Sequence, residues 1–196
     1  LAENTQAKIA VLEAGSKDND PMIHIPAGYG QILAKDRHVW PYDTTPQHGT
    51  VRRFRMGKVV GGGTSINAMC YVRGQKRDFD HWHAASGHDD DWSFENIWNT
   101  FIEQEKNDTF HNKHHGTTGT LAVPLPHGIN PLNQYCMKAF QEYGVPSNAD
   151  YNGDSQVGVS PVQRNASEQK RCSAWVAHLP RHVDSRRAPP PTHRTL

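Results

Sequence analysis

The sequence predicts an α/β fold, and three features of the chain support this prediction. An apolar stretch at residues 7–12 has the composition of a buried strand and ends in an acidic residue, Glu13. A glycine-rich stretch, Gly57 to Met69, has three consecutive glycines followed by short polar residues. Two further segments, residues 93–102 and 131–144, repeat apolar side chains at helical spacing. Strand, glycine-rich turn and helices in one chain indicate the α/β class.

Length and composition limit the function classes. The 196 residues allow one large domain, but an apolar content of 35% is low for a self-contained one. A net charge of +1 gives no field for nucleic acid or an anionic membrane. The three cysteines form no C-x-x-C pair, which excludes a disulfide framework and fits a reducing, cytoplasmic compartment. No apolar run has membrane-spanning length, and no signal peptide is present. We therefore expect no nucleic-acid partner and no membrane span.

The strand expected at residues 7–12 carries Ile9, Val11 and Leu12, and residues 1–4 are expected to end a helix. In a Rossmann unit, an acidic residue at the carboxyl end of a buried strand binds the adenosine ribose, about 20 residues after the glycine fingerprint. Only twelve residues precede Glu13, and the chain does not begin with Met. We therefore expect the first strand and its glycines to lie upstream. A Glu that merely ends a strand remains the alternative.

Residues 16–50 are rich in Pro, Gly and aromatic residues. A long connection of this kind is more often a lid or a covering loop than slack chain.

The glycine-rich stretch predicts contact with a ligand. Three glycines suit either a turn with positive φ or a surface on which no side chain fits. Thr64 and Ser65 are suited to capping a helix that continues through residues 68–72, and a helix N-terminus favours a phosphate or an electron-rich ring. A plain glycine loop is the alternative. The spacing excludes a P-loop, and the charged run Arg52 to Arg55 does not predict the strand that a dinucleotide fingerprint needs before it.

The later elements are predicted as follows. Ser93 caps one helix, while Pro131 and Gly144 bound the other. A turn-rich loop covers residues 150–155, and a strand is expected at residues 157–162. His81 and His83 are interpreted as packing or surface residues.

A metal-binding or scaffold protein using the loop from His111 to His115 is the alternative function, although a fourth ligand is not visible. The basic, proline-rich end is either an anion-binding tail or a segment outside the reading frame of the rest.

The residues resemble the glucose-methanol-choline (GMC) oxidoreductase family, FAD-dependent alcohol oxidases and dehydrogenases, and look closest to its choline and alcohol dehydrogenase branch. The first family pattern is present as Gly57-Lys58-Val59-Val60-Gly61-Gly62-Gly63-Thr64-Ser65-Ile66-Asn67, then Tyr71, Gly74 and Asp80. Other stretches look like the family in the expected order, among them Val11 to Gly15, Ile25 to Tyr29, Asp78 to Trp82, Gln156 to Val159 and Arg171 to Ala174.

The resemblance implies a partial FAD-binding, Rossmann-like GMC fold with the start of the substrate-binding region, incomplete at both ends. It implies a partial FAD-binding domain at residues 1–80, a helical segment and the start of the substrate-binding domain at 81–177, and a tail outside the family pattern at 178–196. By the resemblance the ribose, pyrophosphate and ring of FAD are bound by Glu13, Val60, Gly62, Gly63, Thr64, Asn67, Ala68, Met69 and Cys70. Ile66 aligns with the histidine to which some members attach FAD, so we expect non-covalent FAD.

The implied activity is oxidation of an alcohol by hydride transfer to flavin N5, with oxygen or a quinone-type compound as acceptor. Two departures from the family matter. The N-terminal G-x-G-x-x-G is absent, and the second family pattern, with the histidine that takes the alcohol proton, would follow the end of this chain. No catalytic residue is therefore assigned, and we expect an inactive fragment.

Overall fold

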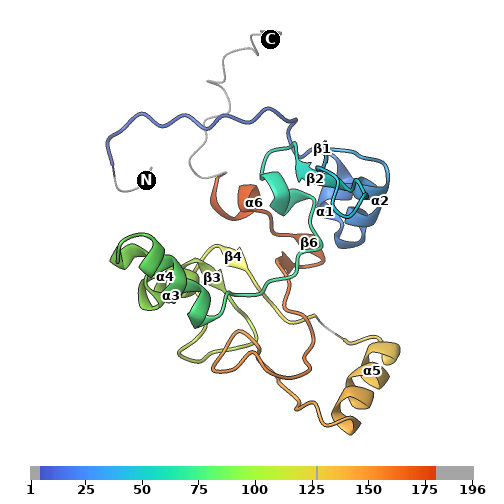
Figure 1. The fold of residues 1–196 in the computed structure, drawn as a ribbon, viewed down its shortest axis with the longest axis vertical. Coiled ribbons are helices and arrows are strands. Elements are labelled where there is room, and N and C mark those ends of the chain that lie inside the picture. The colour runs from blue at the N-terminus through green and yellow to red at the C-terminus, as the bar shows by residue number, and fades with distance from the viewer. Residues whose placement is uncertain (1–4, 127, 180–196) are drawn as a thin grey trace.

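The computed structural model describes residues 5–126 and 128–179. Short helices and strands alternate with long irregular segments (Figure 1). In chain order the elements are α1 (Pro21–His24), the 3-10 turn η1 (Pro26–Gly28), α2 (Tyr29–Ala34), β1 (Val39–Asp43), β2 (Arg53–Gly57), the 3-10 turn η2 (Gly62–Ser65), α3 (Lys76–Ala85), the 3-10 turn η3 (Asp90–Trp92), α4 (Phe94–Gln104), β3 (Glu105–Lys106), β4 (Leu121–Ala122), α5 (Pro131–Glu142), β5 (Ala166–Ser167), β6 (Lys170–Arg171) and α6 (Ala174–His178).

The strands of the described residues form three two-stranded sheets. β1 pairs antiparallel with β2, with Val39 opposite Gly57 and Asp43 opposite Arg53. β3 pairs parallel with β4, and β5 pairs antiparallel with β6. The charged run that was not expected to form a strand is therefore β2. Its side chains are exposed, and Arg53 and Arg55 form ion pairs with Asp36, so hairpin pairing outweighs the missing apolar pattern.

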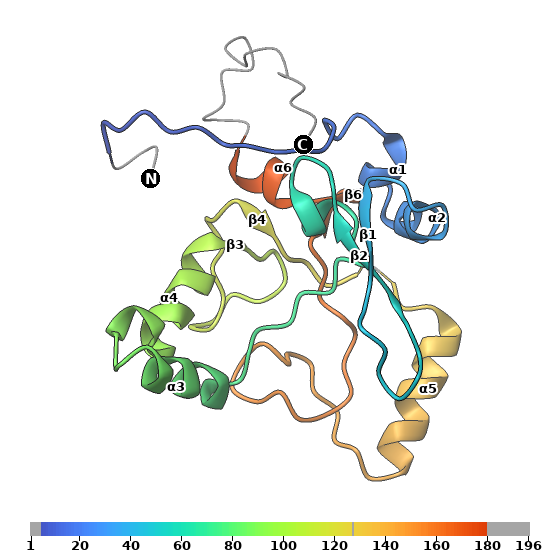
Figure 2. The ribbon, with the colours of Figure 1, turned by 45° about the horizontal axis from the view of Figure 1, so that its top comes forward.

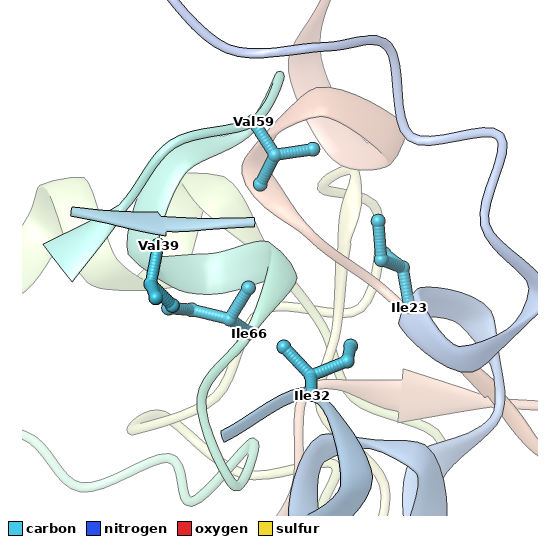
Figure 3. Packing of buried hydrophobic residues seen from close by; sticks show 5 residues of the cluster. All are labelled: Ile23, Ile32, Val39, Val59 and Ile66. Atoms are coloured by element: carbon cyan, nitrogen blue, oxygen red, sulfur yellow. The ribbon is translucent and has the colours of Figure 1, made fainter. Parts of the chain in front are cut away.

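An apolar core holds the upper part of the molecule, around the hairpin and the glycine-rich stretch. Figure 3 shows its side chains pointing toward one another from α1, α2, β1 and both sides of η2: Ile23, Ile32, Val39, Val59 and Ile66. The segment predicted as a long connection, residues 16–50, supplies most of this core and contains two α-helices and a strand. It is a folded segment, held in part by Asp20, which accepts from the Met22 amide and pairs with Arg37 at 2.6 Å.

The lower part is built on aromatic packing between α3 and α4. Phe79 is 4% exposed, and its ring contacts Trp82, Phe94 and Phe101 at centroid distances of 5.6 to 6.2 Å. The predicted cap of α4 is confirmed, since the Ser93 hydroxyl accepts from the Asn96 amide. Helix α3 begins at Lys76, so both His81 and His83 lie on it.

The strand predicted at residues 7–12 is wrong. The segment is extended but pairs with no described strand, and its apolar side chains are exposed, with Leu12 at 93%. Figures 1 and 2 show it crossing one end of the molecule as a single chain, passing α6. A buried strand needs neighbours on both sides, and the described residues supply neither. The helix end expected at residues 1–4 lies outside the described residues.

The strand predicted at residues 157–162 is also wrong. Val157 is 72% exposed, and the segment forms only one isolated parallel bridge, between Ser147 and Val159. The turns predicted before it are confirmed at residues 151–154.

Helix α5 begins at Pro131 and is followed by Gly144 at φ +96°, as predicted. Its apolar face is not buried. Leu132, Tyr135 and Tyr143 are 68, 72 and 90% exposed. Both views place α5 at the edge of the molecule, away from α3 and α4 (Figures 1 and 2). None of the helices among the described residues combines the length and apolar character that crossing a membrane requires.

Candidate functional site

The glycine-rich stretch is a tight turn fixed by main-chain hydrogen bonds on both sides. The Lys58 amide donates to His38 O (2.8 Å), and the Val60 amide donates to Ser16 O (2.9 Å). Gly61 and Gly62 then take positive φ values of +89° and +57°, which reverse the chain into η2. These two positions need glycine, because other residues are strained at positive φ.

The glycines divide into those that face protein and those that face open space. A Cβ on Gly15 would meet Lys58 at 2.1 Å, and one on Gly57 would meet Gly62 at 2.4 Å. These two glycines therefore allow main chain to pack on main chain. A Cβ on Gly62 or Gly63 would meet no described atom within 4 Å. The outer face of the turn is open, as are other glycines of the described residues such as Gly49 and Gly87.

The hydroxyl residues of the turn cap no helix that follows them in the chain, and the helix predicted at residues 68–72 is absent. Thr64 donates instead to Gly61 O (2.5 Å), and Ser65 donates to Val60 O (2.7 Å). Both hydroxyls satisfy carbonyls of the turn itself, which stabilises the 3-10 conformation and ends it at Ser65.

The segment after η2 is irregular and alternates buried with exposed residues. Asn67 Oδ1 accepts from the Met69 amide at 3.0 Å, and Met69 is buried with φ +63°. Ala68 and Cys70 are exposed beside it. The Asn67 side chain thus stabilises a strained backbone that presents residues 68 and 70 outward.

Two segments, β6 and the start of α6, close over the turn from the C-terminal side, and sequence reasoning assigned them no role. Arg171 on β6 donates through Nη1 to Thr64 O (3.0 Å) and to Asn67 Oδ1 (2.9 Å). Its Nε donates to Ile23 O on α1 (2.7 Å), and the Ala174 amide donates to Thr64 Oγ1 (2.9 Å). The signal available in the sequence was the run Arg171 to Ala174, which matches the family pattern.

Arg171 is buried without a carboxylate. Its residue exposure is 2%, its acceptors are neutral oxygens, and no ion pair links it to an acidic residue in the described part of the chain. Nη2 is buried and has no hydrogen-bond partner among the described residues. Burial lowers the pKa of Arg171 to about 10, so the guanidinium still carries its positive charge at neutral pH.

Glu13 lies on the exposed N-terminal segment. Its carboxylate accepts from the Gly15 amide at 2.7 Å, and Gly15 packs against Lys58 at the start of the glycine-rich stretch. Glu13 is thus linked to the glycine-rich stretch only through Gly15, and its side chain is exposed.

Polar side chains bind the main chain that leaves the turn. The carbonyl of Tyr71 accepts from Tyr151 Oη (2.8 Å) and from Asn152 Nδ2 (3.1 Å). Gln156 donates to Arg73 O (2.7 Å), and the Arg73 amide donates to Asn152 Oδ1 (2.9 Å). Burial raises the pKa of Tyr151 to about 12, which keeps its hydroxyl a donor. They add to the main-chain pairing of this segment, in which the Tyr71 amide donates to Gln163 O and the Asn165 amide donates to Met69 O.

A hollow of about 510 Å³ opens beside Cys70. Most of its lining surface is apolar, and none of its lining side chains is charged: Cys70, Val72, Gln75, Tyr151, Gln156, Gly158, Ser160 and Val162.

A buried network of charges lies under this segment. Arg73 donates to Glu105 at 2.6 Å, and both side chains are fully buried. His115 contacts Glu105 through Nδ1 (3.1 Å) and Asp150 through Nε2 (2.9 Å). Burial alone would lower the pKa of His115, but the hydrogen bonds and charges of Glu105 and then Asp150 outweigh it and raise the pKa above its ordinary value.

Of the histidine loop, only His115 among the described residues contributes a side chain to this network. Glu105 and Asp150 lie against opposite nitrogens of the His115 ring, so the three side chains do not converge on one point. His111 is exposed, and the hydrogen-bond contact of its ring among the described residues is with Asp108 O. Across residues 5–126 and 128–179, no group of three or more His, Cys, Asp or Glu side chains is arranged to hold a metal ion.

Comparison with known proteins gives one family and several relatives. Residues 13–187 match the family described as GMC oxidoreductase. The chain is 33% identical over 188 residues to an alcohol dehydrogenase [acceptor] of Pseudomonas putida, covering 94% of this chain and 34% of that protein. It is 36% identical over 177 residues to an oxygen-dependent choline dehydrogenase of Pectobacterium atrosepticum, covering 87% of this chain and 32% of the relative.

Solved structures agree with the sequence relatives. The crystal structure of pyridoxine 4-oxidase from Mesorbium loti superposes with a TM-score of 0.87 at 29% identity, covering 95% of this chain and 37% of that one. A formate oxidase of Aspergillus oryzae superposes with a TM-score of 0.76 at 20% identity, which supports the fold alone. The chain thus spans about a third of the length of the relatives that it matches.

Proposed function

Because the chain belongs to the GMC oxidoreductase family, a family of enzymes whose cofactor is FAD, we propose that it forms the flavin-binding wall of an alcohol-oxidising enzyme. The substrate is the CH–OH group of an alcohol, the substrate class in the names of the matched alcohol and choline dehydrogenases. The electron acceptor is oxygen or a quinone-type compound.

The open outer face of the turn is the observation that carries this proposal. A flat ring needs main chain without side chains in front of it, and the Cβ directions of Gly62 and Gly63 are free of described atoms. The residues that would hold the cofactor are Val60, Gly62, Gly63, Thr64, Asn67, Ala68, Met69 and Cys70, with Glu13 on the ribose. Ile66 is 4% exposed and belongs to the apolar core, so it supports non-covalent binding.

When bound, FAD supplies the acceptor for the hydride that leaves the alcohol carbon. This chain contributes binding and orientation. The turn fixes the main chain against which the ring lies, and the hollow beside Cys70 gives an uncharged space where a substrate can approach. Residues 1–80 provide the cofactor wall and residues 81–177 begin the substrate region, with the run Arg171 to Ala174 returning to the wall.

The proton of the alcohol needs a base, and we assign none in this chain. By family resemblance, none of the thirteen histidines of this chain stands at the position of the catalytic histidine. His115 is enclosed between Glu105 and Asp150, so it is not free to take a substrate proton. We therefore propose that this chain alone does not turn over an alcohol.

The test is a titration of the purified chain with FAD, followed by flavin fluorescence, with two leucine variants. Gly63→Leu fills the open face of the turn, whereas Gly30→Leu adds the same side chain at an equally open position on α2. We expect wild type and Gly30→Leu to bind FAD with equal affinity and Gly63→Leu to lose at least tenfold. Equal binding by all three would overturn the proposed site.

Turnover is tested separately. Wild type saturated with FAD, an alcohol and an artificial acceptor should give no reduction of the acceptor above the level of free FAD. Measurable turnover would show that the chain carries its own base.

A further inference from the structure

We propose that Arg171 is a positioning residue for the cofactor: it fixes Asn67 and the main chain beyond it, and it places an unneutralised positive charge behind the turn. This inference rests on the proposed function and assigns a role to a residue far from the glycine-rich stretch in sequence.

The positioning part follows from a chain of hydrogen bonds. Arg171 Nη1 donates to Asn67 Oδ1, and the same oxygen accepts from the Met69 amide. Met69 holds φ +63°, a conformation that costs free energy unless its surroundings enforce it. Arg171 thereby restricts the Asn67 side chain to the orientation that holds residues 68–70 in place.

The charge part follows from what surrounds the guanidinium. Its partners are two carbonyls, Ile23 O and Thr64 O, and one side-chain amide oxygen, so the described residues neutralise none of its charge. Nη2 has no partner, although it is buried. Leaving a buried cation uncompensated is costly, and a purely structural role would be served by a residue without that cost.

An anionic ligand on the outer face of the turn would supply the missing negative charge. Thr64, whose carbonyl accepts from Arg171, is exposed on that face next to Gly63. The FAD pyrophosphate is anionic, and a flavin gains negative charge on reduction, so both binding and reduction are favoured by a cation behind the turn.

The experiment compares Arg171→Met with Arg171→Lys, with Arg164→Met as the control that removes an exposed arginine. Three quantities are measured on the full chain: FAD affinity, the midpoint potential of bound FAD at saturation, and amide hydrogen exchange at Met69 without FAD. We expect Arg171→Met to bind FAD at least tenfold more weakly, to shift the potential to a more negative value, and to lose protection at Met69. Arg171→Lys should keep the potential, because it keeps the charge, and lose part of the affinity. Arg164→Met should match wild type.

Each part of the inference has its own failure. An unchanged midpoint potential in Arg171→Met would overturn the proposed electrostatic role of Arg171. Unchanged amide exchange at Met69 would overturn its proposed positioning role. Asn67→Ala removes the amide oxygen that links Arg171 to Met69 and keeps the arginine, so it decides the positioning if Arg171→Met does not fold. Without FAD, exchange of the Asn165 amide, which donates to Met69 O, should become faster, and unchanged exchange would overturn the positioning. Wild type that binds no FAD contradicts the proposed function, while the exchange measurement still tests the link between Arg171 and Met69.

Discussion

The two buried arginines among the described residues have opposite surroundings. Arg73 pairs with a buried carboxylate, Glu105, and its guanidinium lies 4.7 Å from the centroid of the Trp98 ring. Arg171, at the glycine-rich turn, contacts neutral oxygens and retains a buried N–H without a partner among the described residues. The positive charge of Arg73 is neutralised by a carboxylate of the protein, as expected of a structural centre. The positive charge of Arg171 is neutralised by no described residue, as expected where an anionic ligand is to bind.

The largest predicted effect comes from breaking the buried ion pair between Arg73 and Glu105. Glu105→Gln leaves Arg73 buried with no carboxylate against it, and we expect a loss of about 3 to 5 kcal/mol in the free energy of unfolding. Denaturant unfolding measures it. Lys138→Met is the control, because the Lys138–Glu142 pair is exposed, and it should leave the midpoint unchanged. A loss near zero for Glu105→Gln would mean that the lower region does not depend on this pair.

The next effect tests how tightly the turn is packed. Gly57→Ala would place a Cβ 2.4 Å from Gly62 C, a backbone atom, so we expect destabilisation of about 1 to 3 kcal/mol. Gly30→Ala meets nothing within 4 Å and lies in α2, so it should be neutral or stabilise by about 0.4 to 1 kcal/mol. Thermal unfolding of both variants gives the comparison, and equal midpoints would contradict the close approach.

A smaller effect is the pH dependence of the balanced network. The pKa of His115 lies above its ordinary value of 6.5 in the folded chain, so the folded state binds the proton more tightly than the unfolded state. Its contribution to stability is therefore complete below about pH 6.5 and is lost as pH rises through the folded pKa. Urea midpoints measured from pH 5 to 9 should fall over that window in wild type and fall less in His115→Gln. His48→Gln, which changes an exposed histidine, should follow wild type.

The smallest predicted effect lies on α5. Tyr135 is 72% exposed, so Tyr135→Gln should change the free energy of unfolding by no more than about 0.5 kcal/mol. Phe79→Ala, at a residue 4% exposed, should destabilise by several times as much. A large loss in Tyr135→Gln, measured by denaturant unfolding of the isolated chain, would show that the apolar face of α5 is covered in solution.

Local patterns in the sequence predicted local structure well. Ser93 caps α4, Pro131 and Gly144 bound α5, and the glycine-rich stretch is a turn with an open face. The family resemblance, FAD as the family cofactor and the partial α/β fold were confirmed by the comparisons. The assignment of individual cofactor-binding residues and the division into domains stay predictions.

Local patterns failed where pairing decides the outcome. Residues 7–12 have the composition of a buried strand but no described neighbours, whereas the charged β2 is a strand because β1 pairs with it. The hydroxyls of Thr64 and Ser65, suited to capping a helix, bind carbonyls of their own turn instead. The composition of a segment shows how much apolar surface it could bury. Whether it forms a strand depends on which segments the fold places beside it.

The sequence by itself determined where the chain turns, where two of its helices begin and which family it resembles. These features depend on residues a few positions apart, whose conformations and hydrogen bonds are fixed by covalent spacing. Only the tertiary structure decided that Arg171 meets Asn67, 104 residues away, and that His115 lies between Glu105 and Asp150. Such contacts depend on which distant segments pack together, and the strength of a buried charge depends on the groups that packing leaves around it.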